Sequence, residues 1–279
     1  MEALRCGFAI VAPASRGLGF AFAQQLLAHT SLPIIATART NCDQVRCRLL
    51  ESVKAEHFNA ERRLRVFKVD VTDESTISEM TSAIREMYPE TLLRLATTVP
   101  GILHVEKSPS QIDAEYSLRS FQVNALGPML LMKHLSSFLP TASSPPFHDS
   151  EEVSGQDSSQ WRLPESHAIY AMMAARVGSV SDNTSGGWYS YRASKASVFQ
   201  LAKTFDLYLQ SQSGERAMAV AMHPGTVHTD FTKDYWDGRS MLQPEESATL
   251  LLKLLCSMGT GPKEGRGRCW DWNGKEVML

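Results

Sequence analysis

A tyrosine and a lysine four residues apart are the strongest chemical signal in the sequence. Tyr191 and Lys195 stand at the two ends of Tyr191-Arg192-Ala193-Ser194-Lys195, where the pattern predicts the start of a helix, so the two side chains share one face. An ammonium beside a phenol stabilises the phenolate and lowers its pKa from about 10. Such a tyrosine can donate a proton to a carbonyl oxygen as hydride arrives, or accept one in reverse. Tyr189 lacks this partner, because the residue four positions on is Ala193.

A glycine-containing turn near the start of the chain can hold a phosphate. An apolar run ends in Ala12-Pro13-Ala14-Ser15-Arg16-Gly17-Leu18-Gly19, and a helix-like segment follows. A turn at a helix N-terminus presents backbone amides and the positive end of the helix dipole to an anion. Gly17 allows close approach of the backbone, and Gly19 allows tight packing of helix on strand. Taken alone, the motif is also compatible with a generic strand-to-helix turn.

A basic residue lies where a dinucleotide's ribose would be recognised. Arg39 follows the apolar residues 34–38 and stands twenty positions after Gly19. Folds that prefer NAD place an acid there to accept the ribose hydroxyls, whereas an arginine pairs with a 2′-phosphate. Arg16 supplies a second positive charge. The pattern favours NADP(H) over NAD(H), with a solvated surface arginine as the alternative reading of Arg39.

Short apolar strands alternate with helix-length segments along the chain. Strands are predicted at residues 7–11, 33–38, 64–69, 92–98, 167–173, 217–223 and 268–272, and helices at 19–29, 43–57, 74–87, 117–139, 191–210 and 245–255. Strands this apolar, alternating with helices, predict an α/β single-domain Rossmann fold: a doubly wound parallel sheet of about seven strands with helices on both faces. Ligands of such sheets bind at the carboxyl ends of the strands.

One segment interrupts the alternation. Residues 141–166 are rich in Ser, Pro, Asp and Glu, which predicts a flexible surface insertion within one domain spanning residues 1–279. A regulatory or partner-binding loop is the alternative reading of this insertion.

Bulk composition narrows the possible partners. The net charge of −2 gives no electrostatic case for nucleic acid. No apolar run approaches the length that spans a bilayer, and the first residues do not resemble a signal sequence. The five cysteines are scattered without metal-site spacing, so we expect reduced thiols, a cytoplasmic location and no metal.

Residues 6–274 together resemble the short-chain dehydrogenase/reductase family. The resemblance rests on the phosphate loop, Asp70 after the third strand, Asn124 in Val123-Asn124-Ala125-Leu126-Gly127, the Tyr191–Lys195 pair, and Pro224-Gly225-Thr226-Val227-His228-Thr229. Within the family, residues 175–179, 186–195, 223–229 and 270–274 resemble the C-factor-like branch. The resemblance implies a one-domain, NADP(H)-dependent oxidoreductase acting on a small carbonyl or alcohol substrate.

The resemblance also implies a role for each matching residue. Tyr191 would be the general acid/base, Lys195 would bind the nicotinamide ribose and tune Tyr191, and Asn124 would kink its helix and hold a water linked to Lys195. Asp70 would bind the adenine amino group. The remaining cofactor contacts would come from Ser15, Arg16, Gly17, Leu18, Gly19, Arg39, Val71, Pro224, Gly225, Val227 and Thr229. Members often form homodimers through the helices that begin near Ser117 and Tyr191.

Three departures from the family pattern leave an alternative open. Pro13 replaces the first glycine of the loop and removes an amide donor. Residues 98–101, Thr-Val-Pro-Gly, lack the asparagine that steadies the central strands. The serine at the end of the fifth strand falls at Ala174 or Ala175, and losing one oxyanion donor costs about 10²–10³ in rate. Ser179 is the candidate replacement. The alternative function is a catalytically impaired cofactor sensor or a signalling scaffold of the same fold.

Overall fold

Seven parallel strands form one sheet in the order β3-β2-β1-β4-β5-β6-β7. The structure is a computed structural model that describes residues 5–53, 59–148, 162–235, 241–261 and 264–279. The strands are β1 (Phe8–Ala12), β2 (Ile34–Ala38), β3 (Leu64–Lys68), β4 (Leu93–Thr98), β5 (Ala168–Met173), β6 (Ala217–His223) and β7 (Cys269–Asp271). Because β1 pairs with β2 on one side and β4 on the other, the strand order reverses there. The crevice at their carboxyl ends is therefore the expected ligand site.

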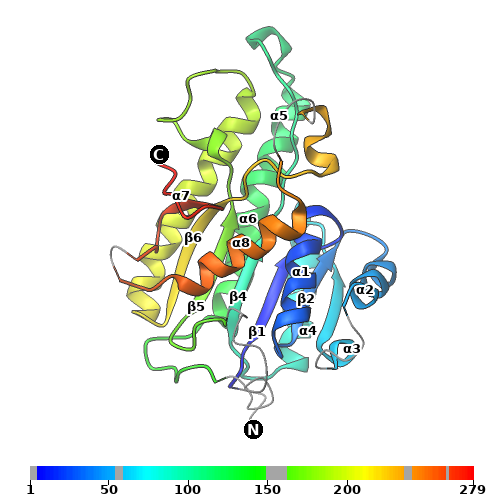
Figure 1. The fold of residues 1–279 in the computed structure, drawn as a ribbon, viewed down its shortest axis with the longest axis vertical. Helices are drawn as coiled ribbons and strands as arrows, with labels where there is room; N and C mark the ends of the chain where they lie inside the picture. Colours follow the sequence, from blue (N-terminus) through cyan, green and yellow to red (C-terminus); the bar gives the residue numbers. More distant parts are fainter. Residues whose placement is uncertain (1–4, 54–58, 149–161, 236–240, 262–263) are drawn as a thin grey trace.

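Helices cover both faces of the sheet (Figure 1). Alternate residues of β1 point to opposite sides: Ala9 and Val11 join one core cluster, whereas Phe8 and Ile10 join the other. The first cluster is completed by α1 (Gly17–His29), α2 (Cys42–Glu51) and α8 (Pro244–Ser257), and the second by α4 (Glu74–Met87), α6 (Gly127–Leu135) and α7 (Tyr189–Ser213). Two shorter helices are α3 (Ala60–Arg63) and α5 (Ala114–Phe121). The doubly wound α/β fold is thus confirmed.

The predicted single helix over residues 117–139 is wrong in detail. The chain turns helical at Ala114, and a π-helical turn at Gln122–Leu126 separates α5 from α6. Pro128 has no backbone N–H, so it cannot continue the i→i−4 ladder, and the Gly127 amide bonds the carbonyl of Gln122 five residues back. The π-turn changes which face of the helix Asn124 occupies.

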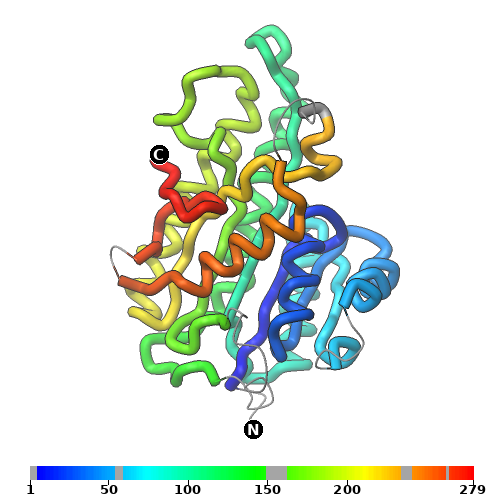
Figure 2. The backbone as a smooth tube through the Cα atoms, in the orientation of Figure 1, coloured from blue at the N-terminus to red at the C-terminus, as the bar shows by residue number. Residues whose placement is uncertain are grey.

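The ends of the predicted insertion are anchored to the core. Phe147 and Leu163 are buried, and the guanidinium of Arg94, itself fully buried in β4, donates to the carbonyls of Leu163 and Pro164. Arg216 donates to the carbonyls of Ser144, Pro145 and Ser166. Both anchors lie at the amino-terminal edge of the sheet (green tube near the N-terminus in Figure 2). The middle of the insertion, residues 149–161, lies outside the described residues.

Within the described ranges, no helix has the length and apolar character that crossing a bilayer requires. None of the five cysteines, all of which lie in the described ranges, forms a disulfide.

Candidate active site at the carboxyl ends of the strands

Threonine hydroxyls tie the central strands together where the family asparagine is missing. Thr98 Oγ1 donates to the carbonyl of Ala171 in β5 at 3.3 Å, and Thr97 Oγ1 donates to that of Ile10 in β1 at 3.4 Å. Both threonines are fully buried. The strand end that precedes Gly101 is therefore braced on both sides, although by different side chains from those the family pattern implies.

Asn124 holds the segment that follows β4. Its Oδ1 accepts from the amide of Ile102 at 2.8 Å, and its Nδ2 donates to the Ile102 carbonyl at 2.9 Å. Nδ2 also donates to Ser194 Oγ on α7 at 3.0 Å. Asn124, which lies in the π-turn, thus joins residues 101–106 after β4, here called the β4 loop, to the helix that carries Tyr191 and Lys195.

Lys195 is buried between two strand ends. Its Nζ donates to the Met173 carbonyl at 2.8 Å and to the Pro100 carbonyl at 3.4 Å. A Cβ on Gly101 would lie 3.6 Å from this Nζ. Burial lowers the pKa of Lys195 to about 8, because the charged form loses its hydration.

Tyr191 is buried beside Phe231, with ring centroids 6.0 Å apart. Phe231 comes from the short helix η7 (Asp230–Tyr235), and its ring edge also lies 3.7 Å from where a Cβ on Gly101 would be. Gly101, Tyr191, Lys195 and Phe231 therefore lie close together at the carboxyl ends of β4 and β5.

The position of the missing serine is apolar. Ala174 belongs to the second core cluster, the one that α4, α6 and α7 complete, and Ala175 directly precedes the short helix η6 (Arg176–Gly178). Ser179 ends that helix, is buried, and accepts the amide of Asp182 at 3.1 Å. Its oxygen therefore caps the turn over residues 179–182.

The phosphate loop keeps the packing that its glycines provide. A Cβ on Gly19 would lie 1.9 Å from the Pro13 carbonyl oxygen, so no side chain fits there. Gly17 adopts a positive φ of 54° and lies against Thr229, whose methyl would be 3.3 Å from an added Cβ. Leu18 packs on the core, and the carbonyl of Ser15 accepts from Arg48.

The amino end of α1 offers donors to an anion. Arg16 is the N-cap residue, is exposed and makes no side-chain capping hydrogen bond. The first-turn amides of α1 therefore have no capping partner from Arg16, at the carboxyl end of β1. The Ala12–Pro13 peptide before the loop is cis.

Asp70 is held in a fixed orientation by its neighbours. Its Oδ1 accepts from the amide and the hydroxyl of Thr72 at 2.9 and 2.7 Å, and Arg119 Nη1 on α5 donates to that hydroxyl at 3.3 Å. Burial raises the pKa of Asp70, but the Thr72 hydrogen bonds and the Arg119 and Arg39 charges outweigh it, so the pKa lies below its ordinary value. The carboxylate is consequently ionised at neutral pH.

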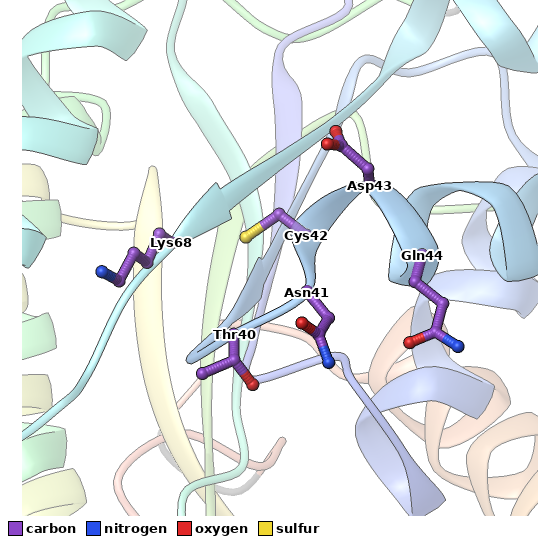
Figure 3. A pocket seen from close by; sticks show the side chains of 6 residues that line it. All are labelled: Thr40, Asn41, Cys42, Asp43, Gln44 and Lys68. Atoms are coloured by element: carbon purple, nitrogen blue, oxygen red, sulfur yellow. The ribbon is translucent and has the colours of Figure 1, made fainter.

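An open cavity of about 640 Å³ begins at Thr40, the residue that follows exposed Arg39 in the chain. Figure 3 shows its lining, which comes from the turn into α2 and the end of β3: Thr40, Asn41, Cys42, Asp43, Gln44 and Lys68. This cavity lies at the β2–β3 side of the sheet, whereas Tyr191 and Lys195 lie beyond β4. A ligand that reached both places would have to run along the carboxyl ends of the strands.

The loop after β6 packs on the C-terminal segment. A Cβ on Gly225, which has a positive φ of 80°, would lie 2.7 Å from the indole of Trp272. Val227 bridges to Leu242, and Thr232 Oγ1 donates to the carbonyls of Val227 and Thr229. Pro224 accepts from Ser247 on α8, so the whole turn is fixed from both sides. Val71, which follows β3, lies against Gly127, where an added Cβ would be 2.9 Å from its Cγ2.

Sequence reasoning missed three residues of the site. Glu106 is fully buried and contacts the start of α7, Arg119 contacts Thr72, and Thr98 braces β4. Each acts across a gap of 47 to 84 residues, so no local spacing reveals it.

Known proteins resemble the chain in sequence. A profile of the family described as short chain dehydrogenase matches residues 7–144. The chain is 29% identical over 185 residues to 1-hydroxy-2-glutathionyl-2-methyl-3-butene dehydrogenase of Rhodococcus sp. (strain AD45), covering 66% of this chain and 68% of that protein. It is also 29% identical over 167 residues to C-signal of Myxococcus xanthus, covering 59% of this chain and 81% of that protein.

Solved structures share the fold. The carbonyl reductase Sniffer of D. melanogaster superposes with a TM-score of 0.77 at 20% identity, covering 98% of this chain and 99% of that one. The NADPH-bound carbonyl reductase from chicken fatty liver gives a TM-score of 0.77 at 24% identity, covering 99% and 100% of the two chains.

Proposed function

Since the chain belongs to the short-chain dehydrogenase family, we propose that it is an NADP(H)-dependent oxidoreductase that interconverts a small carbonyl compound and its alcohol. The observation that carries the proposal is that buried Lys195 donates to the carbonyls of Met173 and Pro100, with Tyr191 one helical turn away on α7. Asn124 joins this helix to the segment after β4 through its hydrogen bonds to Ser194 and Ile102.

The residues present suit a bound NADP(H), which supplies or accepts the hydride. The uncapped first turn of α1 would hold the pyrophosphate together with Arg16. Asp70, whose Oδ1 is taken by Thr72, would present its other oxygen to the adenine amino group. Arg39, which directly precedes the cavity residue Thr40 in the chain, would pair with the 2′-phosphate.

The catalytic roles follow from the surroundings of the side chains. Tyr191 donates a proton to the carbonyl oxygen, and the Lys195 ammonium favours the resulting phenolate. Asn124 fixes Ile102 and Ser194, so the β4 loop and α7 keep their spacing while the proton moves. Phe231 beside Tyr191 favours an apolar carbonyl substrate.

Ser179 is our candidate for a second donor to the carbonyl oxygen. Its oxygen accepts from Asp182, which leaves the hydroxyl hydrogen to be donated. A Ser179→Ala variant with kcat at least about tenfold lower would support this role. Unchanged turnover would leave Tyr191 to act as the donor without Ser179.

The methyl groups of Ala174 and Ala175, which cannot donate to the carbonyl oxygen, favour one alternative, a catalytically impaired protein that binds NADP(H) as a sensor.

Four exposed apolar side chains support a homodimer formed through α5 and α7: Tyr116 and Leu118 on α5, and Leu207 and Tyr208 on α7. Sedimentation at several concentrations tests the homodimer, because a monomer at all of them would contradict it.

Two measurements test the proposed function. Fluorescence titration should show tighter binding of NADPH than of NADH, and Arg39→Leu should reduce that preference. NADPH oxidation with menadione, an apolar quinone probe, should disappear in Tyr191→Phe while NADPH binding persists. Unchanged turnover in that variant would remove Tyr191 from the mechanism, whereas NADPH binding without turnover in the unmodified protein would favour the sensor.

A further inference from the structure

Glu106 is a carboxylate buried without any solvent exposure in the segment between β4 and α5. Its Oε2 accepts from the amide of Ser190 at 2.8 Å, across 84 residues. Its backbone carbonyl accepts from the amide of Trp188 at 2.6 Å. One residue thus receives two amides at the start of the helix that carries Tyr191.

The sequence of α7 leaves its own first turn uncapped. Trp188 stands at the N-cap position in the left-handed region, with φ of 50°, and provides no side-chain cap. Helix N-termini leave amide donors without intrahelical partners, and a carboxylate there also meets the positive end of the helix dipole. Glu106 therefore supplies from a distant segment what a Ser, Thr or Asp would supply locally.

The same segment forms the opposite wall of the site. Gly101 lies beside Lys195 Nζ, and Ile102 is held by both polar atoms of Asn124. Residues 101–106 are consequently fixed at one end by Asn124 and at the other by the contact of Glu106 with Ser190. Tyr191 is the next residue after Ser190, so the second contact sets its position relative to the β4 loop.

We propose that Glu106 is a positioning residue that fixes Tyr191 against the β4 loop, an inference that rests on the proposed function of Tyr191. The carboxylate is not held there by a closed polar network. Its Oε1 and the Ser190 Oγ are both buried with no hydrogen-bond partner in the described part of the chain. The unpartnered Oε1 costs free energy, whereas the acceptor for the Ser190 amide stabilises the helix start, so overall stability does not report the role of Glu106. The role of Glu106 therefore lies in local order.

The test compares Glu106→Met, which removes the acceptor, with Glu106→Gln, whose amide oxygen can still accept from Ser190. Glu115→Met, at an exposed acid in the first turn of α5, is the matched control. In each variant, hydrogen–deuterium exchange follows the Ser190 amide and the amides near Phe205, which lie far along the same helix. Kinetics with NADPH and menadione give kcat, and fluorescence titration gives Kd for NADPH.

Glu106→Met should speed exchange at Ser190 about tenfold or more without changing exchange near Phe205. Its kcat should fall about tenfold with Kd for NADPH changed less than threefold, and Glu106→Gln should restore most of kcat. Unchanged exchange at Ser190, unchanged kcat, or equal loss in Glu106→Gln would overturn the proposal. Failure of the proposed function would be distinct: it would show as turnover that survives in Tyr191→Phe, whereas the exchange result depends on no activity.

Discussion

Replacing Lys195 with methionine should stabilise the folded protein at neutral pH while abolishing its activity. The pKa of Lys195 falls from 10.5 to about 8 because the ammonium is buried. At about 1.4 kcal/mol for each pKa unit, the charged form costs the folded state about 3 kcal/mol. Methionine fills a similar volume without this cost, but it leaves the carbonyls of Met173 and Pro100 without their donor, at about 1 kcal/mol each. The free energy of unfolding at pH 7 should therefore rise by about 1 kcal/mol.

The pH dependence gives the sharper test. Between pH 8 and 10.5, Lys195 is protonated in the unfolded chain and neutral in the folded protein, so the unfolded state binds more protons. Stability of the unmodified protein then rises with pH, by about 2 kcal/mol between pH 8 and 9.5 from this group. Lys195→Met lacks this contribution. Its free energy of unfolding should therefore exceed that of the unmodified protein at pH 7 but lie about 1 kcal/mol below it at pH 9.5.

Urea unfolding of both proteins at pH 7, 8, 9 and 9.5, with no nucleotide present, measures these differences. Lys203→Met, at an exposed lysine of α7, is the control and should shift stability equally at every pH. A difference between the unmodified protein and Lys195→Met that stays constant with pH would refute the argument. So would a loss of more than about 1 kcal/mol at pH 7, because desolvation would then be smaller than the hydrogen bonds.

Three further predictions follow from the site and the fold. Ala175→Ser should raise kcat with menadione about tenfold, because it restores a hydroxyl near the carbonyl oxygen. Ala174→Ser should leave kcat unchanged, because Ala174 is a core residue; equal effects of the two variants would show that the donor position is misassigned. Arg119→Leu should weaken NADPH binding by loosening Thr72 and hence Asp70, with little effect on an analogue carrying hypoxanthine in place of adenine; equal weakening of both nucleotides in titrations would contradict this relay. Arg94→Met should lower the free energy of unfolding by about 3 kcal/mol, since the carbonyls of Pro164, Cys6 and Leu163 lose their donor. It should leave Kd for NADPH unchanged, because Arg94 lies at the opposite edge of the sheet from the proposed nucleotide site. A matching loss of NADPH affinity in titrations would contradict that separation.

The sequence predicted the fold because its signals are local. Strands of the doubly wound sheet are short apolar runs, and their positions agreed with the structure to within a few residues. The Tyr191–Lys195 pair and the turn with Gly17 and Gly19 are likewise read from spacing along one element. The helix over 117–139 was mispredicted because the π-turn depends on the missing amide of Pro128 and on packing around Asn124, which periodicity does not register.

Contacts between segments far apart in the chain were decided only by the tertiary structure. Thr98 replaces the missing asparagine by reaching the neighbouring strand β5, and Glu106 caps a helix 84 residues away. The lowered pKa of Lys195 likewise depends on burial between two strand ends. Element type and motif spacing are set by neighbours within a few residues, so one sequence suffices to predict them. Hydrogen-bond partners, burial and charge depend on which elements the sheet order brings together, and that order exists only in the folded chain.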